Sequence, residues 1–412
     1  MMKFKVMGLL LLLIGPSASQ AQKAGKLHLT KEFVNTNLHD AVGQMKYLAS
    51  QTDADKMPRS FEKGKLSTSN TAWWTSGFFP GSLLYLYEAT GDKELLSLAK
   101  ERLRILEKEK FNKGTHDLGF MLFCSFGNAL RLTGDSTAYK EILATGAESL
   151  SSRYSPVTKT ILSWDHTSWQ YPVIIDNMMN LEFLTQLTKI TGNKKYWDIA
   201  KNHANTTIAN HFRKDYSSYH VVDYDKTTGK AIGHYTAQGA FDESAWARGQ
   251  AWGLYGYVMM YRETKDKTYL EQARKIAKFY LNHPKLPADL IPYWDFDKDD
   301  LKPDNKYYKN KDLRDVSTAS IVASALLELS LYTKGKEGEG YLRKAEKMLE
   351  SLASPAYKAT QGELDGFILK HSVGSIPHGT EIDVPLTYAD YYYIEALIRY
   401  QRMLAGEQVI KQ

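Results

Sequence analysis

Residues 87–103, YEATGDKELLSLAKERL, contain the end of one helix, a tight turn and the start of a second helix. Gly91 is suited to the left-handed conformation that often ends a helix, and Asp92 is suited to cap the next one. The residues after Asp92 place leucines on one face and Lys and Glu on the other. This stretch therefore predicts two consecutive helices packed as a hairpin.

The same order of signals recurs along the chain. Related stretches are LRLTGDSTAYKEIL at 130–143, TKITGNKKYWDIAKNH at 188–203, YRETKDKTYLEQARKIAKF at 261–279 and LYTKGKEGEGYLRKAEKML at 331–349. Each ends an apolar helix, turns, and opens an amphipathic one. Irregular repetition of helix pairs predicts a stacked or closed helical array.

The predicted helices form two alternating series. One series is apolar nearly all round, and we place it at 73–88, 117–132, 173–190, 244–261, 315–333 and 387–402. The other is amphipathic and charged, and we place it at 33–50, 93–110, 137–152, 195–210, 268–282 and 340–352. A helix that is apolar all round is packed on both sides. We therefore predict an all-α protein, an (α/α)6 toroid or six-hairpin barrel, with the apolar series inside.

Strand signals are sparse, and SSYHVVDYD at 217–225 is the best candidate for a short hairpin arm. The following DYDKTTGK lacks the spacing and terminal Glu of a calcium loop, so we interpret it as a turn. No HExxH, CxxC or GxSxG pattern indicates a metal or a serine nucleophile. We expect neither a metal nor a cofactor.

The first 21 residues have the pattern of a signal peptide. Lys3 and Lys5 precede an apolar run, MGLLLLLIG, and residues 19–21 form a small-x-small cleavage site. The run is too short for a stable membrane anchor. Cys124 is the only cysteine, so no disulfide framework exists. We predict an exported protein, in a bacterial periplasm, whose residues 22–412 form a single domain without a membrane anchor.

Composition narrows the class of partner. Apolar residues make up 43% of the chain and charged residues 24%, as in a globular protein. Removal of Lys3 and Lys5 takes the formal charge from +6 to +4. This mild excess is compatible with a small anionic substrate, whereas the scattered basic residues give no indication of nucleic-acid binding. The sequence leaves the oligomeric state open.

In such a barrel, the segments that lead into the inner helices share one open face. They read TAWWTSGFFPG, GTHDLGF, SWDHTSWQYPVIIDN, HYTAQGAFDESAWARGQAW, RDVSTAS and LKHSVGSIPHGTEIDVPLTYADYYY. Trp, His, Asp, Gln and Arg predominate in these segments. This mixture is typical of a site where a sugar ring stacks on aromatic side chains and its hydroxyl groups find polar partners.

Three charged residues stand out. Asp176 lies among Ile175, Met178 and Met179, and we expect Pro172 to begin this helix, about a turn earlier. Asp176 is therefore either catalytic or a buried structural acid. Asp117 has the position of an ordinary N-cap. Arg248, on an apolar helix, needs an anionic partner, either a protein acid or a substrate carboxylate.

The motifs THDLGF, IIDNMMNL, SAWARGQAWGLYGY and DVSTASIVASALLEL, with the preceding WTSGFFPG, resemble glycoside hydrolase family 88, the unsaturated glucuronyl hydrolases. The resemblance runs from about Trp73 to Glu395. It implies an (α/α)6 barrel, with Asp176 and Asp117 as the catalytic aspartates. The substrate-binding residues that it implies are Trp74, His116, Trp164, His220, Gln238, Trp246, Arg248 and Trp252, with Trp169 competing for the position of Trp164.

The implied substrates are unsaturated uronyl oligosaccharides, which a lyase releases from a glycosaminoglycan. In this family an acid protonates C4 of the 4,5-unsaturated uronic acid, water adds at C5, and the resulting hemiketal collapses. Burial of Asp176 would raise its pKa and keep the proton available. Some members bind sulfate through two serines and a lysine. Here Ser372 and Ser375 are present, but Pro377 stands at the lysine position.

Three alternatives remain open. An unsaturated rhamnogalacturonyl hydrolase shares the fold and the hydration chemistry but acts on pectin fragments. A polysaccharide lyase on the same fold would need a base such as Tyr235 or His234. A non-catalytic toroid would bind sugars through the same aromatic residues, because a fold does not by itself establish turnover.

Overall fold

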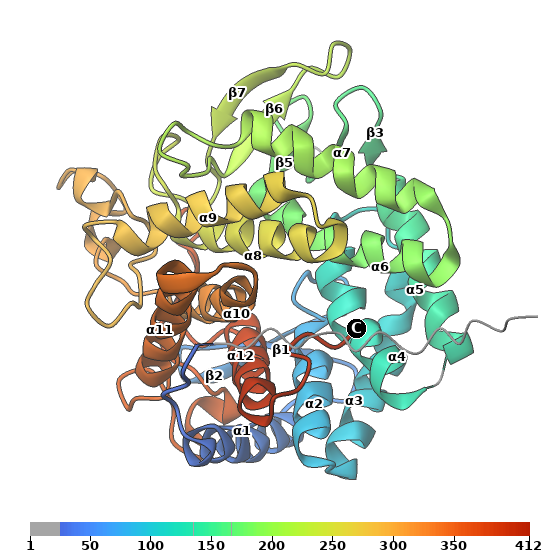
Figure 1. Cartoon of the computed structure of the whole chain (residues 1–412), viewed down its shortest axis with the longest axis vertical. Coiled ribbons are helices and arrows are strands. Elements are labelled where there is room, and N and C mark those ends of the chain that lie inside the picture. Colours follow the sequence, from blue (N-terminus) through green and yellow to red (C-terminus); the bar gives the residue numbers. More distant parts are fainter. Residues whose placement is uncertain (1–24, 135, 166) are drawn as a thin grey trace, which may run out of the picture.

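The structure is a computed structural model that describes residues 25–134, 136–165 and 167–412. The predicted signal peptide, residues 1–21, lies outside the described residues. The described chain is mostly helical, and Figure 1 shows the helices arranged in pairs around a centre. None of the described helices is both long enough and apolar enough to cross a membrane.

The predicted inner ring is present. Its members are α2 (Phe78–Thr90), the π-helix η2 (Gly119–Gly127) continued by α4 (Asn128–Thr133), the 3₁₀-helix η3 (Ile175–Asn180) continued by α6 (Leu181–Thr191), α8 (Ala247–Thr264), α10 (Val316–Tyr332) and α12 (Thr387–Ala405). Consecutive members pack against each other, and α12 also packs against α2. This last contact closes the ring, so the predicted (α/α)6 toroid is confirmed.

The charged helices form the outer ring. They are α1 (Lys31–Gln51), α3 (Lys93–Leu106) followed by the 3₁₀-helix η1 (Glu107–Phe111), α5 (Ser136–Ser151), α7 (Lys194–Asn210), α9 (Lys267–Asn282) and α11 (Gly335–Leu352). Each packs on a neighbouring inner helix, as α9 does on α8 and α11 on α10. Figure 1 shows both of these pairs side by side.

The repeated turns have the expected caps. Gly91 ends α2 with a φ of 73°, and Asp92 caps α3 by accepting a hydrogen bond from the amide of Glu94 at 3.0 Å. Gly192 and Asn193 do the same between α6 and α7. A side-chain cap contributes about 1 kcal/mol to a helix. These signals are local, which is why sequence alone located the turns.

The strands form small antiparallel sheets in the connecting segments. They are β1 (Met57–Glu62) with β2 (Lys65–Ser69), β3 (Tyr154–Ser155) with β4 (Thr160–Ile161), β5 (Pro172–Ile174) with β6 (Val221–Tyr224) and β7 (Ala231–Tyr235), and β8 (Ser372–Ser375) with β9 (Thr380–Val384). The hairpin arm predicted at 217–225 is present as β6, which pairs with β7. The first two residues of DYDKTTGK end β6, and residues 225–230 form the turn to β7. Short 3₁₀-helices η4 (Lys298–Asp300), η5 (Tyr308–Asn310) and η6 (Glu363–Gly366) complete the connections.

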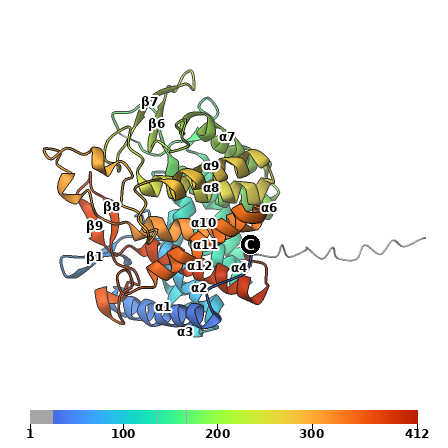
Figure 2. The same cartoon turned by 60° about the vertical axis from the view of Figure 1, so that its left-hand side comes forward.

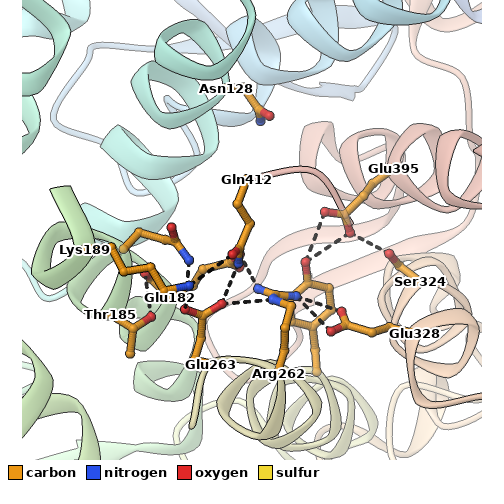
Figure 3. Close-up of polar contacts among 12 residues, drawn as sticks. Asn128, Glu182, Thr185, Lys189, Arg262, Glu263, Ser324, Glu328, Glu395 and Gln412 are labelled. Carbon is orange, nitrogen blue, oxygen red and sulfur yellow. Dashed lines mark hydrogen bonds and ion pairs between the residues drawn. The ribbon is translucent and has the colours of Figure 1, made fainter. Parts of the chain in front are cut away.

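The two ends of the barrel differ. Figure 2 shows β1, β8 and β9 gathered on the left and the C-terminus on the right. Figure 3 shows the polar contacts around Arg262, Glu328 and Glu395, close to the C-terminal residue Gln412. These residues belong to an ion-pair network between inner helices. Within it, Arg262 of α8 pairs with Glu328 of α10 at 2.8 Å and also with Glu182 of α6, and Arg399 of α12 pairs with Glu328 at 3.2 Å. The network therefore joins four members of the inner ring.

Candidate active site

The candidate site lies at the end of the barrel where the inner helices begin. Asp117 precedes η2, and Asp176 and Arg248 are the second residues of η3 and α8. Asp315 is the N-cap of α10, and Tyr388 is the second residue of α12. Because the first turns of the inner helices meet at one end of the ring, residues distant in sequence come together there.

The segment before Asp176 differs from the prediction. Pro172 does not begin a helix, because Pro172–Ile174 form β5 and pair with β6. Proline fits this strand because its φ is compatible with extended backbone. The amide of Ile175 donates to the carbonyl of His220 at 3.0 Å, and η3 starts at Ile175. The strand pairing therefore places Asp176 beside His220.

Asp176 is a buried acid whose pKa is raised. Burial raises its pKa from 3.8 to about 7. The positive charge of Arg248 opposes this increase, and the negative charge of Asp117 adds to it. The Oδ2 atom of Asp176 has no hydrogen-bond partner among the described residues. A carboxyl group with a raised pKa and one unpartnered oxygen is suited to general-acid catalysis.

His220 faces Asp176 with one defined ring nitrogen. Its Nδ1 accepts hydrogen bonds from the amides of Ala237 at 3.0 Å and Gln238 at 3.2 Å. Burial lowers the pKa of His220 to about 3, so the ring is neutral. The remaining proton is therefore on Nε2, which lies 3.9 Å from Oδ2 of Asp176. This arrangement gives the site an N–H donor next to the acid.

Asp117 lies beside His116 and is not a helix cap. The carboxylate of Asp117 accepts a hydrogen bond from Oγ1 of Thr115 at 2.8 Å, and its Oδ1 lies 3.3 Å from Nε2 of His116. His116 in turn donates from Nδ1 to the carbonyl of Ser163 at 2.8 Å. The helix η2 begins after Leu118, whose side chain caps nothing. The N-cap interpretation of Asp117 was therefore wrong.

Arg248 finds its anionic partner within the protein. Its Nη1 lies 3.2 Å from Oδ2 of Asp315, and its two Nη atoms donate to the carbonyls of Val373 and Gly374 in β8. The guanidinium also lies 4.5 Å from the ring centre of Trp246. The sequence left open whether the partner of Arg248 is a protein acid or a substrate carboxylate, and the structure shows a protein acid. The Nε atom of Arg248 remains without a partner among the described residues.

The predicted tryptophans surround these polar groups. Trp246 packs on His220 with ring centres 4.6 Å apart, and buried Trp252 packs on Phe120. Half-buried Trp74 contacts Tyr388 and Phe120. These aromatic side chains supply flat apolar surface for a sugar ring.

Trp164 and Trp169 occupy different positions. The edge of Trp164 meets both His116 and His220, with ring centres 6.4 and 5.9 Å apart. Trp169 stacks on Trp164 at 6.0 Å and contacts Tyr235. Trp164 is therefore the one that touches the predicted site residues.

The β8–β9 hairpin contacts two of the predicted site residues. Gln238 donates from Nε2 to the carbonyl of Gly374 at 3.2 Å, so this predicted residue is tied to the same carbonyl as Arg248. On β8, Oγ of Ser375 lies 2.7 Å from Nδ1 of His378, and Ser372 is buried. All ten predicted site residues therefore lie at this end of the barrel, each in at least one of the contacts described above.

Sequence reasoning missed Asp315 and Tyr388. Both are fully buried, and the hydroxyl group of Tyr388 has no partner among the described residues. The only signal was their position, because each lies at the start of an inner helix, in RDVSTAS and PLTYADYYY. An Asp at a helix start is ordinarily read as a cap, and nothing in the sequence pairs Asp315 with Arg248.

Metal-ligating residue types and the candidate lyase base His234 can be located in the structure. Within the described residues, no three His, Cys, Asp or Glu side chains are grouped so as to hold a metal ion. His234, a candidate base for a lyase, has its Nε2 3.1 Å from the carbonyl of Asn210 and packs on Tyr219. The ring of His234 is therefore held by contacts beside strand β7.

Comparison with known proteins gives consistent matches. The chain is 45% identical over 333 residues to an unsaturated glucuronyl hydrolase of Formosa agariphila, covering 80% of each chain. It is 31% identical to an unsaturated chondroitin disaccharide hydrolase of Streptococcus pneumoniae, covering 91% of this chain and 93% of the relative.

Solved structures and the family model agree. The crystal structure of an unsaturated glucuronyl hydrolase specific for heparin superposes with a TM-score of 0.86 at 47% identity, covering 91% of this chain and 99% of that one. Residues 49–402 match the model of Glycosyl Hydrolase Family 88. On this match and on the shared toroid, the chain belongs to glycosyl hydrolase family 88.

Proposed function

We propose that this protein is an unsaturated glucuronyl hydrolase. It releases 4,5-unsaturated glucuronic acid from the non-reducing end of lyase-generated glycosaminoglycan oligosaccharides. The observation that carries the proposal is the buried carboxyl group of Asp176 beside the Nε2–H of His220, with burial raising the pKa of Asp176 to about 7. The family membership and the matched relatives support the same activity.

The reaction follows from the protonation state of Asp176. Its carboxyl group donates a proton to C4, and positive charge develops at C5 and the ring oxygen. Water adds at C5, and the carboxylate left on Asp176 accepts the proton that this water loses. The hemiketal then collapses and releases the neighbouring sugar. The negative charge of Asp117 raises the pKa of Asp176, which favours the protonated form of its carboxyl group.

The remaining predicted residues surround the acid. We propose that Trp74, Trp164, Trp246 and Trp252 provide apolar surface for the sugar, while His116, His220, Gln238 and Arg248 supply or orient polar contacts. We further propose that residues 22–412 form a single catalytic domain, and that residues 1–21 direct export to a bacterial periplasm. The basis for export is the sequence pattern of those 21 residues.

Absorbance of the conjugated double bond tests the activity. A hydrolase of this type removes the ultraviolet band of an unsaturated disaccharide, a lyase creates that band from polymer, and a binding protein leaves it unchanged. A panel of glycosaminoglycan and pectin disaccharides separates the glucuronyl from the rhamnogalacturonyl activity. Turnover of the pectin fragments alone would replace our proposal by the second one.

Isotope incorporation tests the mechanism. In heavy water, deuterium should appear at C4 of the product, because the acid delivers its proton there. A saturated glucuronide with the same leaving group should be inert, because it has no double bond to protonate. Hydrolysis of the saturated compound at a comparable rate would indicate a conventional glycosidase pair.

A further inference from the structure

Arg248 and Asp315 form a buried pair at the edge of the active site. Both side chains are almost fully buried, and Nη1 of Arg248 lies 3.2 Å from Oδ2 of Asp315. No other acid has an ion pair with Arg248 within 4 Å among the described residues. A buried charge is costly without such a partner.

Asp315 holds Arg248 through more than the ion pair. Its carboxylate also accepts hydrogen bonds from Oγ of Ser317 at 2.6 Å and Oγ1 of Thr318 at 2.9 Å. These contacts fix the carboxylate at the start of α10. Arg248 is fixed from the other side by the carbonyls of β8 and by the rings of Trp246 and Tyr388. The guanidinium therefore has one defined position.

The position of the guanidinium matters for Asp176 because the ring of Trp246 lies between the two. The centre of that ring is 4.5 Å from the guanidinium and 4.6 Å from the ring of His220, whose Nε2 lies 3.9 Å from Oδ2 of Asp176. Charge acts over distances of this order in a buried site. The groups whose charge or hydrogen bonding acts on Asp176 are Arg248, Asp117 and Trp252, with His220 as a neutral neighbour. The groups that act on Arg248 are Asp315, Asp176, Tyr388 and Glu381, of which Glu381 is itself paired with Arg59 at 2.6 Å. Asp315 is therefore the anion that most directly offsets the charge of Arg248.

We propose that Asp315 is a positioning residue for the reaction: by neutralising and fixing Arg248, it limits how strongly that cation favours ionisation of Asp176, and so sets the upper pH limit of activity. The proposal rests on Asp176 acting as the acid. It assigns to Arg248 an electrostatic role that does not require contact with the substrate.

Substitutions of the two partners should shift the pH profile in opposite directions. In Asp315→Asn the unbalanced Arg248 should move the alkaline limb of kcat/KM to lower pH, by about one unit. In Arg248→Gln the limb should move to higher pH, because the cation is gone. The double variant, which lacks both charges, should return close to the wild-type position. A purely structural pair would lower kcat without moving the limb.

Asp390→Asn is the matched control. Asp390 is a fully buried acid that accepts hydrogen bonds from the amides of Ile368 and Leu369 and has no ion-pair partner among the described residues. Its substitution should change thermal stability but leave the alkaline limb in place. An equal shift in Asp390→Asn and Asp315→Asn would overturn the proposal.

A second measurement distinguishes a failure of the role proposed for Asp315 from a failure of the proposed function. Selective ¹³C labelling of aspartate, with Asp176→Asn to assign the signal, reports the ionisation of Asp176 without turnover. If the Asp176 signal shifts as expected but the activity profile does not, Asp176 is not the acid and the proposed function fails. If Asp315→Asn does not fold, the double variant is compared with Arg248→Gln. An identical Asp176 titration in those two variants would refute the role of Asp315.

Discussion

The amide of Gly119 donates a hydrogen bond to Oδ1 of Asn180 at 2.8 Å, and this contact joins the two segments that carry Asp117 and Asp176. A Cβ atom on Gly119 would lie 2.6 Å from that oxygen and 2.8 Å from Cα of Asn180. Only glycine allows so close an approach. The contact therefore sets the spacing between the two aspartates.

Gly119→Ala should force η2 and η3 apart and misplace the two aspartates. Overpacking of this kind costs about 1–3 kcal/mol, and a displacement of about 1 Å at a reacting group lowers the rate about 10²-fold. The check is kcat together with helical content. Gly340→Ala is the control, because its Cβ would meet nothing within 4 Å. It should preserve kcat, and a similar loss in both variants would contradict the spacing role.

Asp176→Asn should abolish turnover with the fold intact. The amide preserves the shape of the side chain but has no proton to deliver, and general acids contribute about 10²–10⁴-fold. The measurement is kcat on an unsaturated disaccharide, with circular dichroism as the test of folding. A rate near that of the wild type would remove Asp176 from the mechanism.

The same substitution should stabilise the protein at high pH. The folded-state pKa of Asp176 is about 7, above the ordinary 3.8, so the folded protein holds a proton that the unfolded chain has released. The free energy of unfolding therefore falls as pH rises from about 4 to about 7, by about 2–3 kcal/mol between pH 5 and 8. Asn does not titrate. The Tm of Asp176→Asn should exceed that of the wild type by a margin that grows over this range, and a constant margin would contradict the raised pKa.

Arg262→Ala should destabilise the barrel without affecting the active site. The substitution leaves half-buried Glu182 without its ion-pair partner and leaves buried Glu328 with Arg399 alone. Breaking a buried ion pair in this way costs up to about 3–5 kcal/mol. Arg274→Ala is the control, because Arg274 forms half-exposed pairs with Glu271 and Glu337. Such surface pairs contribute at most about 1 kcal/mol. Denaturant unfolding should separate the two variants, while the KM of both stays at the wild-type value.

The sequence alone determined the order of the helices and their division into an inner and an outer series. Turn signals such as Gly91-Asp92 act within one turn of the chain, and the two kinds of apolar pattern distinguish inner from outer helices. The motif resemblance then identified Asp117, Asp176 and the surrounding residues. These features depend on neighbours along the chain, which is why the sequence alone predicts them.

Only the tertiary structure decided how those residues are used. Whether Pro172 begins a helix or a strand depends on β6, about 50 residues away, because a strand needs a hydrogen-bonding partner. The pairing of Arg248 with Asp315 depends on where α8 and α10 meet in the ring. The protonation of Asp176 depends on burial by several elements at once. Burial and charge pairing are properties of packed neighbours in space, and the linear sequence does not specify them.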